Sequence, residues 1–103
     1  MPKAYWIAHV DIADPEGYKA YVAANAAPFR KYGARFLVRG GEATPLEGEH
    51  RARHVVIEFK DAETARACFE SPEYQHALSL RRPVSTADLV IVEGYEGPQP
   101  TDP

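Results

Sequence analysis

Residues 3–12 have the sequence KAYWIAHVDI, and this stretch decides where the fold begins. Successive side chains of a β-strand point to opposite faces, so an alternation of period two, carried by aromatic and β-branched residues, predicts a strand. Asp14-Pro15-Glu16 follows, and it combines a capping carboxylate, a proline suited to the first helical position and an acidic residue at the positive end of the helix dipole. The chain therefore begins with a strand and a helix.

The remaining elements follow from the same signals. Helical spacing continues to Tyr32, with Gly33 as the stop and Pro28 as a position at which the helix should kink or restart. Later elements are predicted as a strand at 34–39, a polar connection at 42–53, a strand at 54–60, helices at 62–70 and 72–81, and a last strand at 89–95. The order β-α-β-β-α-β predicts an α+β, ferredoxin-like protomer, in which a four-stranded antiparallel sheet carries its helices on one face.

Composition limits the class of protein. The chain has 103 residues, of which 45% are hydrophobic and 26% are charged. This length and composition suit a single domain, which we expect at 1–96. Residues 97–103 lack an apolar anchor and should form a mobile C-terminal tail. A net charge of −3 without a basic cluster argues against nucleic acid, and no apolar run approaches the roughly 18 residues of a membrane span. The first residues lack a signal-peptide core, so the cytoplasm is the expected compartment. A single cysteine, Cys68, excludes an internal disulfide.

The sheet of such a protomer has one face under its helices and one face uncovered. The helix-covered face is predicted to carry Trp6, Ala8, Val10, Phe36, Val38, Val55, Ile57, Phe59, Val90 and Val92. The uncovered face is predicted to carry Tyr5, Ile7, His9, Leu37, Arg39, Val56, Glu58, Leu89, Ile91 and Glu93. Large aliphatic residues on an uncovered face favour burial against a partner, at about 25 cal/mol per Å². A second copy is the expected partner, so we expect a homodimer.

Four polar residues from four strands are predicted to share the uncovered face. They are His9, Arg39, Glu58 and Glu93. In a ligand site, His9 would shuttle protons and Arg39 would hold a carboxylate or oxyanion, while one of the two glutamates would orient His9 or act as a base. Alternatively, the four would form an ion network that fixes the register of the dimer.

A second group of candidates lies on the predicted helices, where Tyr18, Tyr21, Tyr74 and Arg81 could cover a pocket between helix and sheet. Tyr18 and Arg81 are taken as ligand-binding candidates. Alternatively, the tyrosines pack in the core with their hydroxyls at its rim, and Arg81 interacts with the negative end of a helix dipole. No metal site is predicted, because Arg51 stands where a zinc-protease motif beginning at His50 would need glutamate.

Several segments together resemble one known family. They are YGARFLVRGG at 32–41, LEG at 46–48, VIEF at 56–59, SPEYQ at 71–75, LR at 80–81 and LVIVEG at 89–94. In this combination the chain resembles the bacterial domain-of-unknown-function family numbered 1330, within the dimeric α+β barrel superfamily. The resemblance implies a ferredoxin-like protomer and a dimeric barrel. It implies no single reaction, because the superfamily includes cofactor-independent monooxygenases, muconolactone isomerases and haem-binding members.

Three hypotheses of function follow from these patterns. The first is a small-molecule enzyme without a tightly held cofactor, which acts on an anionic, partly apolar compound by proton transfer or oxygenation. The second is a non-catalytic small-molecule-binding or stress-associated module. The third is a domain whose charged cluster is purely structural and lies at the dimer interface.

Overall fold

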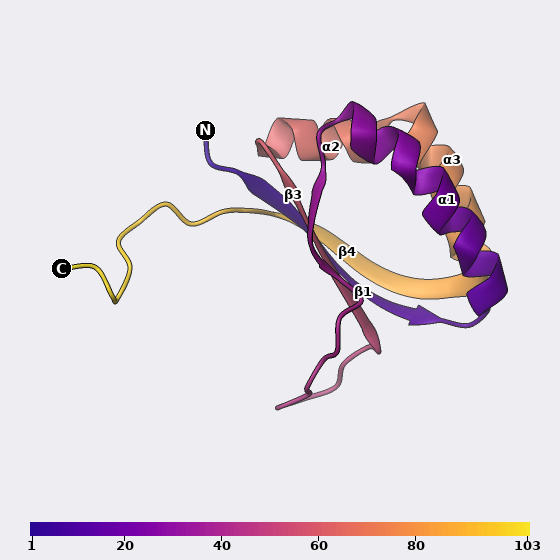
Figure 1. Cartoon of the computed structure of the whole chain (residues 1–103), viewed down its shortest axis with the longest axis horizontal. Helices are drawn as coiled ribbons and strands as arrows, with labels where there is room; N and C mark the ends of the chain where they lie inside the picture. The colour runs from indigo at the N-terminus through magenta and orange to yellow at the C-terminus, as the bar shows by residue number, and fades with distance from the viewer.

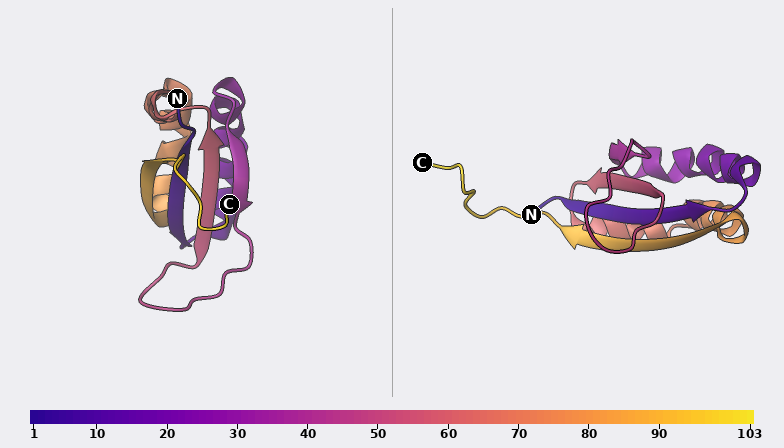
Figure 2. Two further views of the ribbon diagram at one scale, coloured as in Figure 1. Left: turned by 90° about the vertical axis from the view of Figure 1, so that its left-hand side faces the viewer. Right: turned by 90° about the horizontal axis from the view of Figure 1, so that it is seen from below.

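The structure is a computed structural model of residues 1–103. Its elements are β1 (Ala4–Ile12), α1 (Pro15–Lys31), β2 (Arg35–Arg39), β3 (Arg53–Phe59), α2 (Ala62–Glu70), α3 (Pro72–Arg81), a short 3-10 helix (Arg82–Val84) and β4 (Ser85–Glu93). The four strands form one antiparallel sheet in the order β2-β3-β1-β4. The helices lie on one face of this sheet, which we call the inner face, and no layer covers the outer face (Figure 1, Figure 2). The predicted ferredoxin-like α+β protomer is confirmed.

The three helices begin where their capping residues stand. The Asp14 carboxylate accepts a hydrogen bond from the Gly17 amide, and the Asp61 carboxylate accepts one from the Thr64 amide at 2.7 Å. At the junction of α2 and α3, the Ser71 hydroxyl accepts from the Tyr74 amide. Each of these bonds satisfies an amide that has no partner inside its helix. Local sequence therefore sets these helix starts.

The structure differs from the predicted bounds at two elements. Helix α1 continues through Pro28 to Lys31 without a restart, and Pro28 is fully buried three residues before the helix ends. Strand β4 begins at Ser85, four residues before the predicted start at Leu89. Residues 85–88 are polar or small, but they pair with the far end of β1, where Ile12 lies opposite Ser85. Pairing with a long neighbour extends the strand beyond its apolar part.

The core lies between the inner face and the helices, and Trp6 is at its centre. The Trp6 ring is 2% exposed, lies 4.9 Å from the Tyr74 ring centroid and donates its indole N–H to the Ala65 carbonyl at 3.0 Å. Cys68 is fully buried in α2, and burial, together with the nearby charge of Glu73, raises the pKa of its thiol to about 12. Cys68 therefore remains a protonated thiol that packs in the core.

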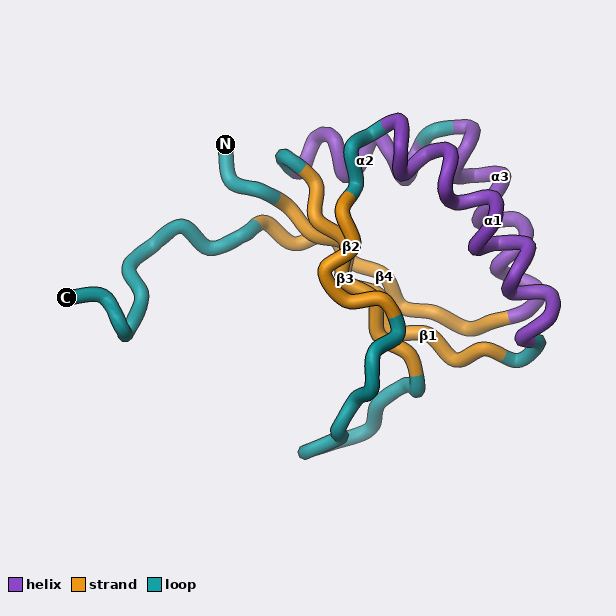
Figure 3. Tube along the Cα trace, viewed as in Figure 1, coloured by secondary structure: helices purple, strands orange, loops and turns teal.

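Two segments leave the body of the protein (Figure 3). The connection between β2 and β3 has no helix or strand at residues 40–52 and projects from one end of the sheet. The residues after Glu93 run away from the other end, with the Tyr95 hydroxyl donating to the Pro98 carbonyl. None of the helices combines the length and the hydropathy that a membrane-spanning segment requires.

The assignment of residues to the two faces needs two corrections. Leu89 and Ile91 lie opposite Ala8 and Trp6 on the inner face, whereas Val90, 53% exposed, lies on the outer face. The predicted faces of β4 are therefore reversed: Val90 and Val92 are outside, and Leu89, Ile91 and Glu93 belong to the inner side. In β2 a bulge between Phe36 and Val38 leaves Leu37 without an opposite residue, so Val38 is outside and Arg39 is inside.

Candidate functional site

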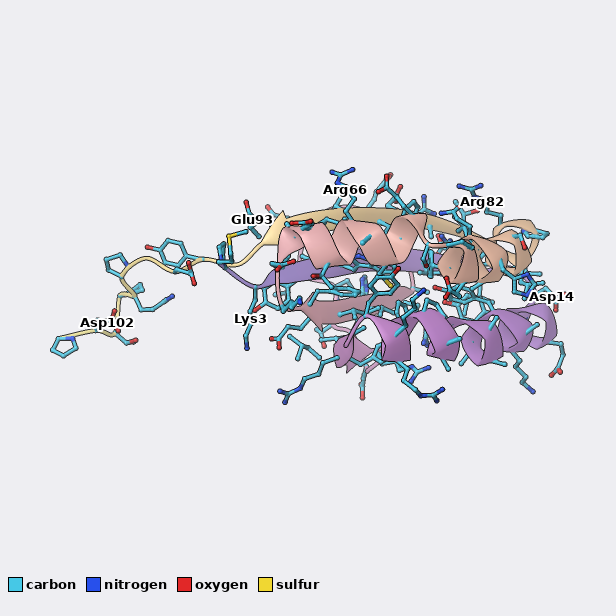
Figure 4. The ribbon with its side chains drawn as sticks, turned by 90° about the horizontal axis from the view of Figure 1, so that it is seen from above. Lys3, Asp14, Arg66, Arg82, Glu93 and Asp102 are labelled. Atoms are coloured by element: carbon cyan, nitrogen blue, oxygen red, sulfur yellow. The ribbon has the colours of Figure 1, made fainter.

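The polar cluster predicted for the outer face does not form. Its four members were His9, Arg39, Glu58 and Glu93. His9 and Glu58 are on the outer face, and Glu58 pairs with Lys3 at 3.4 Å, but the β2 bulge places Arg39 on the inner face. Glu93 lies beside Lys3 at the end of the sheet where the tail leaves, opposite the end where Asp14 begins α1 (Figure 4). Neither a four-residue ligand site nor a four-residue ion network exists there.

The structure instead has a cavity between the inner face and helices α1 and α3. Its accessible volume is about 40 Å³, it opens to solvent on one side, and 13 of its 17 lining residues are hydrophobic. The floor includes Ala8, Val10 and Leu89 from the sheet, and Val22 belongs to the helical wall. Concave sites with a mostly apolar lining and a few polar groups are typical of small-molecule binding.

Three arginines reach this cavity from different elements. They are Arg39 of β2, Arg53 of β3 and Arg81 of α3. Each lies near an aromatic ring: the guanidinium carbon of Arg39 is 4.0 Å from the Phe36 centroid, that of Arg53 is 5.7 Å from Tyr18, and that of Arg81 is 5.6 Å from Tyr21. Such stacking holds a guanidinium without neutralising its charge.

No acidic side chain balances these charges. The lining of the cavity contains no Asp or Glu, and the ion pairs of the protein use Lys3, Lys19, Lys31 and Arg51 as their cations. Moreover, the Nε atom of Arg53 is buried and has no hydrogen-bond partner. A buried donor without a partner is costly, so the folded chain leaves one hydrogen-bond requirement of Arg53 open.

Three tyrosines complete the polar part of the lining. The hydroxyls of Tyr21 on α1 and Tyr74 on α3 are 2.9 Å apart and link the two helices. Burial raises the pKa of Tyr21, and Tyr74 beside it adds to the shift. Burial also raises the pKa of Tyr18, although the positive charges of Arg53 and Arg81 oppose this shift. All three phenols are therefore protonated at neutral pH and act as hydrogen-bond donors.

The cavity thus unites three of the six predicted site residues: Arg39, Tyr18 and Arg81. Sequence reasoning missed Arg53, because it assigned this residue to the connection before the strand. The alternation of Phe59, Ile57 and Val55 continues back to Arg53 and could have placed it on the inner face. Asn25, buried on α1, also lines the cavity and was not among the predicted site residues.

A second depression lies on the outer face, and its lining is entirely polar. It includes His9, His54 and Asp88, and the Nδ1 atoms of the two histidines are 2.7 Å apart. At this distance the two rings share a hydrogen bond. Arg51 lies between two carboxylates, with Asp11 at 2.9 Å and Asp88 at 2.8 Å. Arg51 is thus paired with two carboxylates, unlike the arginines of the inner cavity.

The Asp11 carboxylate also anchors the base of the 40–52 connection, and we predict that acid releases it. The Ala52 amide donates to Asp11 at 3.0 Å, and this bond, together with Arg51, lowers the pKa of Asp11 from its ordinary 3.8. Because the folded-state pKa is depressed, the contribution of Asp11 is complete above pH 3.8 and is lost as the pH falls through the folded value. Hydrogen exchange at the Ala52 amide, corrected for intrinsic rates, should therefore show lost protection in this range.

The matched control is Asp11→Asn, which keeps an acceptor for the Ala52 amide but carries no charge. Its exchange at Ala52 should be insensitive to pH over the same range. Protection that falls with pH in this variant as steeply as in the wild type would show that another group controls the connection.

The fold defines the class: an α+β protomer of the ferredoxin-like kind, here with a cavity between its helices and its sheet. The chain belongs to the family described as Domain of unknown function (DUF1330), whose model matches residues 3–95. The family resemblance seen in the sequence is thereby confirmed. No protein with a curated description matches the chain.

Solved structures with similar folds are distant in sequence. RPA0582, a protein of unknown function from Rhodopseudomonas palustris, is 18% identical, with a TM-score of 0.72 over 93% of this chain and 85% of its own. SnoaB, a cofactor-independent oxygenase from Streptomyces nogalater, is 15% identical, with a TM-score of 0.62 over 94% and 97%. A dimeric ferredoxin-like protein of unknown function from Jannaschia sp. CCS1 is 12% identical, with a TM-score of 0.66 over 89% and 99%. These likenesses establish the fold.

Proposed function

We propose that the cavity between the sheet and helices α1 and α3 binds a small, partly apolar organic anion, and that the protein acts on it by proton transfer or oxygenation without a bound cofactor. The observation that carries this proposal is the set of three cavity arginines without a carboxylate partner. Guanidinium groups bind carboxylates and other oxyanions through charge-assisted hydrogen bonds, and an apolar surrounding strengthens them. The apolar lining suits the hydrocarbon part of such a ligand.

The lining also restricts how a reaction would start. It contains no His, Cys, Asp or Glu, and its tyrosines are protonated, so no side chain there can act as a strong base. The substrate would arrive ionised or lose its proton to water, and the arginines would stabilise the anion. Oxygenation would then use dissolved O2 as oxidant: at a methylene carbon, one oxygen atom enters the ligand as a carbonyl and the other leaves as water with the two hydrogens. SnoaB, with a similar fold, is a cofactor-independent oxygenase.

The lack of a base equally favours a second candidate function, a non-catalytic binding module in which the cavity only holds its ligand. The roles proposed from the sequence change accordingly. Arg39 remains the residue that holds an anionic group, joined by Arg53, with Tyr18 and Arg81 as further ligand contacts. His9, Glu58 and Glu93 lie outside this cavity and have no proposed contact with its ligand.

We also propose that the protein forms a homodimer through its outer face. Ile7, Val56 and Val90 form an apolar centre on this face, and Val92 and Val38 flank it with exposures of 44% and 40%. Exposed branched residues on adjacent strands are unusual in a monomer and gain from burial against a second copy. The Jannaschia protein of similar fold is dimeric.

Calorimetry with matched ligands tests the binding part of the proposal. Phenylacetate should bind the protein, whereas phenylacetamide, which has the same shape without the charge, should bind at least about tenfold more weakly. Arg53→Met should weaken phenylacetate binding by a similar factor. Arg66→Met, on the exposed surface of α2 (Figure 4), is the control and should bind like the wild type. Equal binding of acid and amide would contradict the proposal.

Turnover separates the enzyme from the binding module. Acids that bind are incubated with the protein in D2O, and deuterium uptake into the acid is measured by NMR, while an oxygen electrode records consumption of O2. Protein-dependent deuterium uptake or O2 consumption, abolished by Arg53→Met, supports catalysis. Binding without either signal assigns the cavity to the non-catalytic function.

A further inference from the structure

Given the proposed function, on which this inference rests, the number and placement of the arginines say more about the ligand. We propose that the ligand of the cavity is a dianion with two separate anionic groups, a compact dicarboxylate with an apolar centre. One group would lie at the sheet, on Arg39 and Arg53, and the other at the helical wall, on Arg81.

The first step is the balance of charge. A single carboxylate has two oxygens and is fully bound by one or two guanidinium groups. The lining provides three guanidinium groups and no acidic residue. Arg53 and Arg81 are half-buried and Arg39 is exposed, so a monoanion bound by two of them would leave one guanidinium of the lining without a counter-charge. A second anionic group on the ligand removes this cost.

The second step is the placement of the arginines on opposite walls. Arg39 lies opposite Val55, and Arg53 precedes Val55 by two residues on the same face of β3, so both arginines belong to one end of the inner sheet face. Arg81 instead comes from the last turn of α3, near the Tyr21 ring of α1. Apolar residues such as Val10 and Leu89 line the remainder. The sheet and the helical wall thus each supply a basic position, with Tyr18 and Tyr21 beside them, and this arrangement matches a ligand that has an anionic group at each end.

The third step is the space that Gly40 leaves for the Arg53 guanidinium. The Gly40 amide donates to the His54 carbonyl at 2.9 Å, and the backbone of Gly40 has a φ of +69°. A Cβ at this position would collide with the Arg53 guanidinium. The guanidinium thus lies against bare backbone at the end of β2, its Nε without a partner. Gly40 therefore allows the guanidinium to occupy this end of the cavity, where it can bind an oxyanion.

Calorimetry with a graded set of probes tests the dianion. Terephthalate carries two carboxylates, its monoamide carries one in the same shape, and phenylphosphate carries two charges on one group. Terephthalate should bind at least about tenfold more tightly than the monoamide, because the second carboxylate gains a charge-assisted hydrogen bond. Arg81→Met should abolish this preference, so that terephthalate and the monoamide bind the variant with about the same affinity.

The other outcomes are equally decisive. If terephthalate and its monoamide bound equally and Arg81→Met had no effect, the proposal of a dianionic ligand would be overturned. The proposed anion site itself would remain supported. If phenylphosphate bound more tightly than terephthalate, the proposal of two separate anionic groups would be overturned. The ligand would then carry a single doubly charged group. No binding of any probe, together with no binding of phenylacetate, would instead refute the proposed function itself. Arg66→Met again serves as the control for general loss of positive charge.

Gly40→Ala provides an independent test of the positioning of Arg53. The variant should fold, because position 40 is exposed at the end of a strand, but its new Cβ displaces the guanidinium. Terephthalate and monoamide should both lose affinity by about tenfold, since both use the sheet end of the cavity. Gly33→Ala is the matched control, because Gly33 has nearly the same positive φ, +67°, and open space for a Cβ. Unchanged affinity in Gly40→Ala, with circular dichroism like that of the wild type, would show that Arg53 does not hold the ligand.

Discussion

Trp6→Ala is expected to lower the free energy of unfolding by about 3–5 kcal/mol, a large share of the stability of a small domain. The Trp6 ring contacts rings from both layers, with centroid distances of 5.2 Å to Phe59 on the sheet and 5.4 Å to Phe29 on α1. Its removal leaves a cavity in the core and takes the donor from the Ala65 carbonyl. Urea unfolding followed by far-UV circular dichroism measures the effect, since the variant has lost the only tryptophan of the chain.

Trp6→Phe is the matched control. This variant keeps most of the apolar contact but leaves the Ala65 carbonyl without its indole donor. Its free energy of unfolding should therefore fall by less, about 1–3 kcal/mol. If Trp6→Ala unfolded at the same urea concentration as the wild type, the core would not be organised around this residue.

Val90→Asp is expected to convert the proposed homodimer into single protomers, raising the dissociation constant at least about 100-fold. Val90 lies opposite Ile7 on the outer face and is 53% exposed in the protomer, so the substitution costs the fold little. In a two-fold symmetric dimer each copy would bury one unpaired carboxylate, which is strongly unfavourable. Sedimentation velocity over a range of micromolar concentrations measures the change.

Ala26→Asp, on the exposed side of α1, adds the same charge away from the outer face and should leave the assembly unchanged. A wild-type protein that sediments as a single protomer at these concentrations would contradict the outer face as an interface. So would a dimer that Val90→Asp leaves intact.

The order of elements was predictable because its signals are local. Asp14, Asp61 and Ser71 each stand one residue before a helix and accept from an amide three residues on, and α2 and α3 have the predicted bounds. Alternation around Trp6 and Ile57 assigned the faces of β1 and β3 correctly, because a one-residue shift in the register of either strand would bury charged residues. These patterns need no knowledge of distant parts of the chain.

The candidate site was only partly predictable, because it depends on register. A regular β2 would place Arg39 opposite His54 on the outer face, beside His9, and one unpaired residue, Leu37, reverses this. In β4 all four residues from Leu89 to Val92 are apolar, so alternation carries no information and only pairing with β1 decides the faces. Tyr18 and Arg81 were predicted correctly as site residues because the spacing of residues on a helix does not depend on strand register.

The central claim is that the ligand binds among the arginines of the inner cavity. NMR spectra that detect the Nε–Hε groups of arginine, assigned by single Arg→Met variants, test it directly during a titration with terephthalate. The signals of Arg39, Arg53 and Arg81 should move together and saturate at the calorimetric affinity, while Arg51, held by Asp11 and Asp88 on the outer face, stays in place. Movement of Arg51 with the three cavity arginines unchanged would contradict the account.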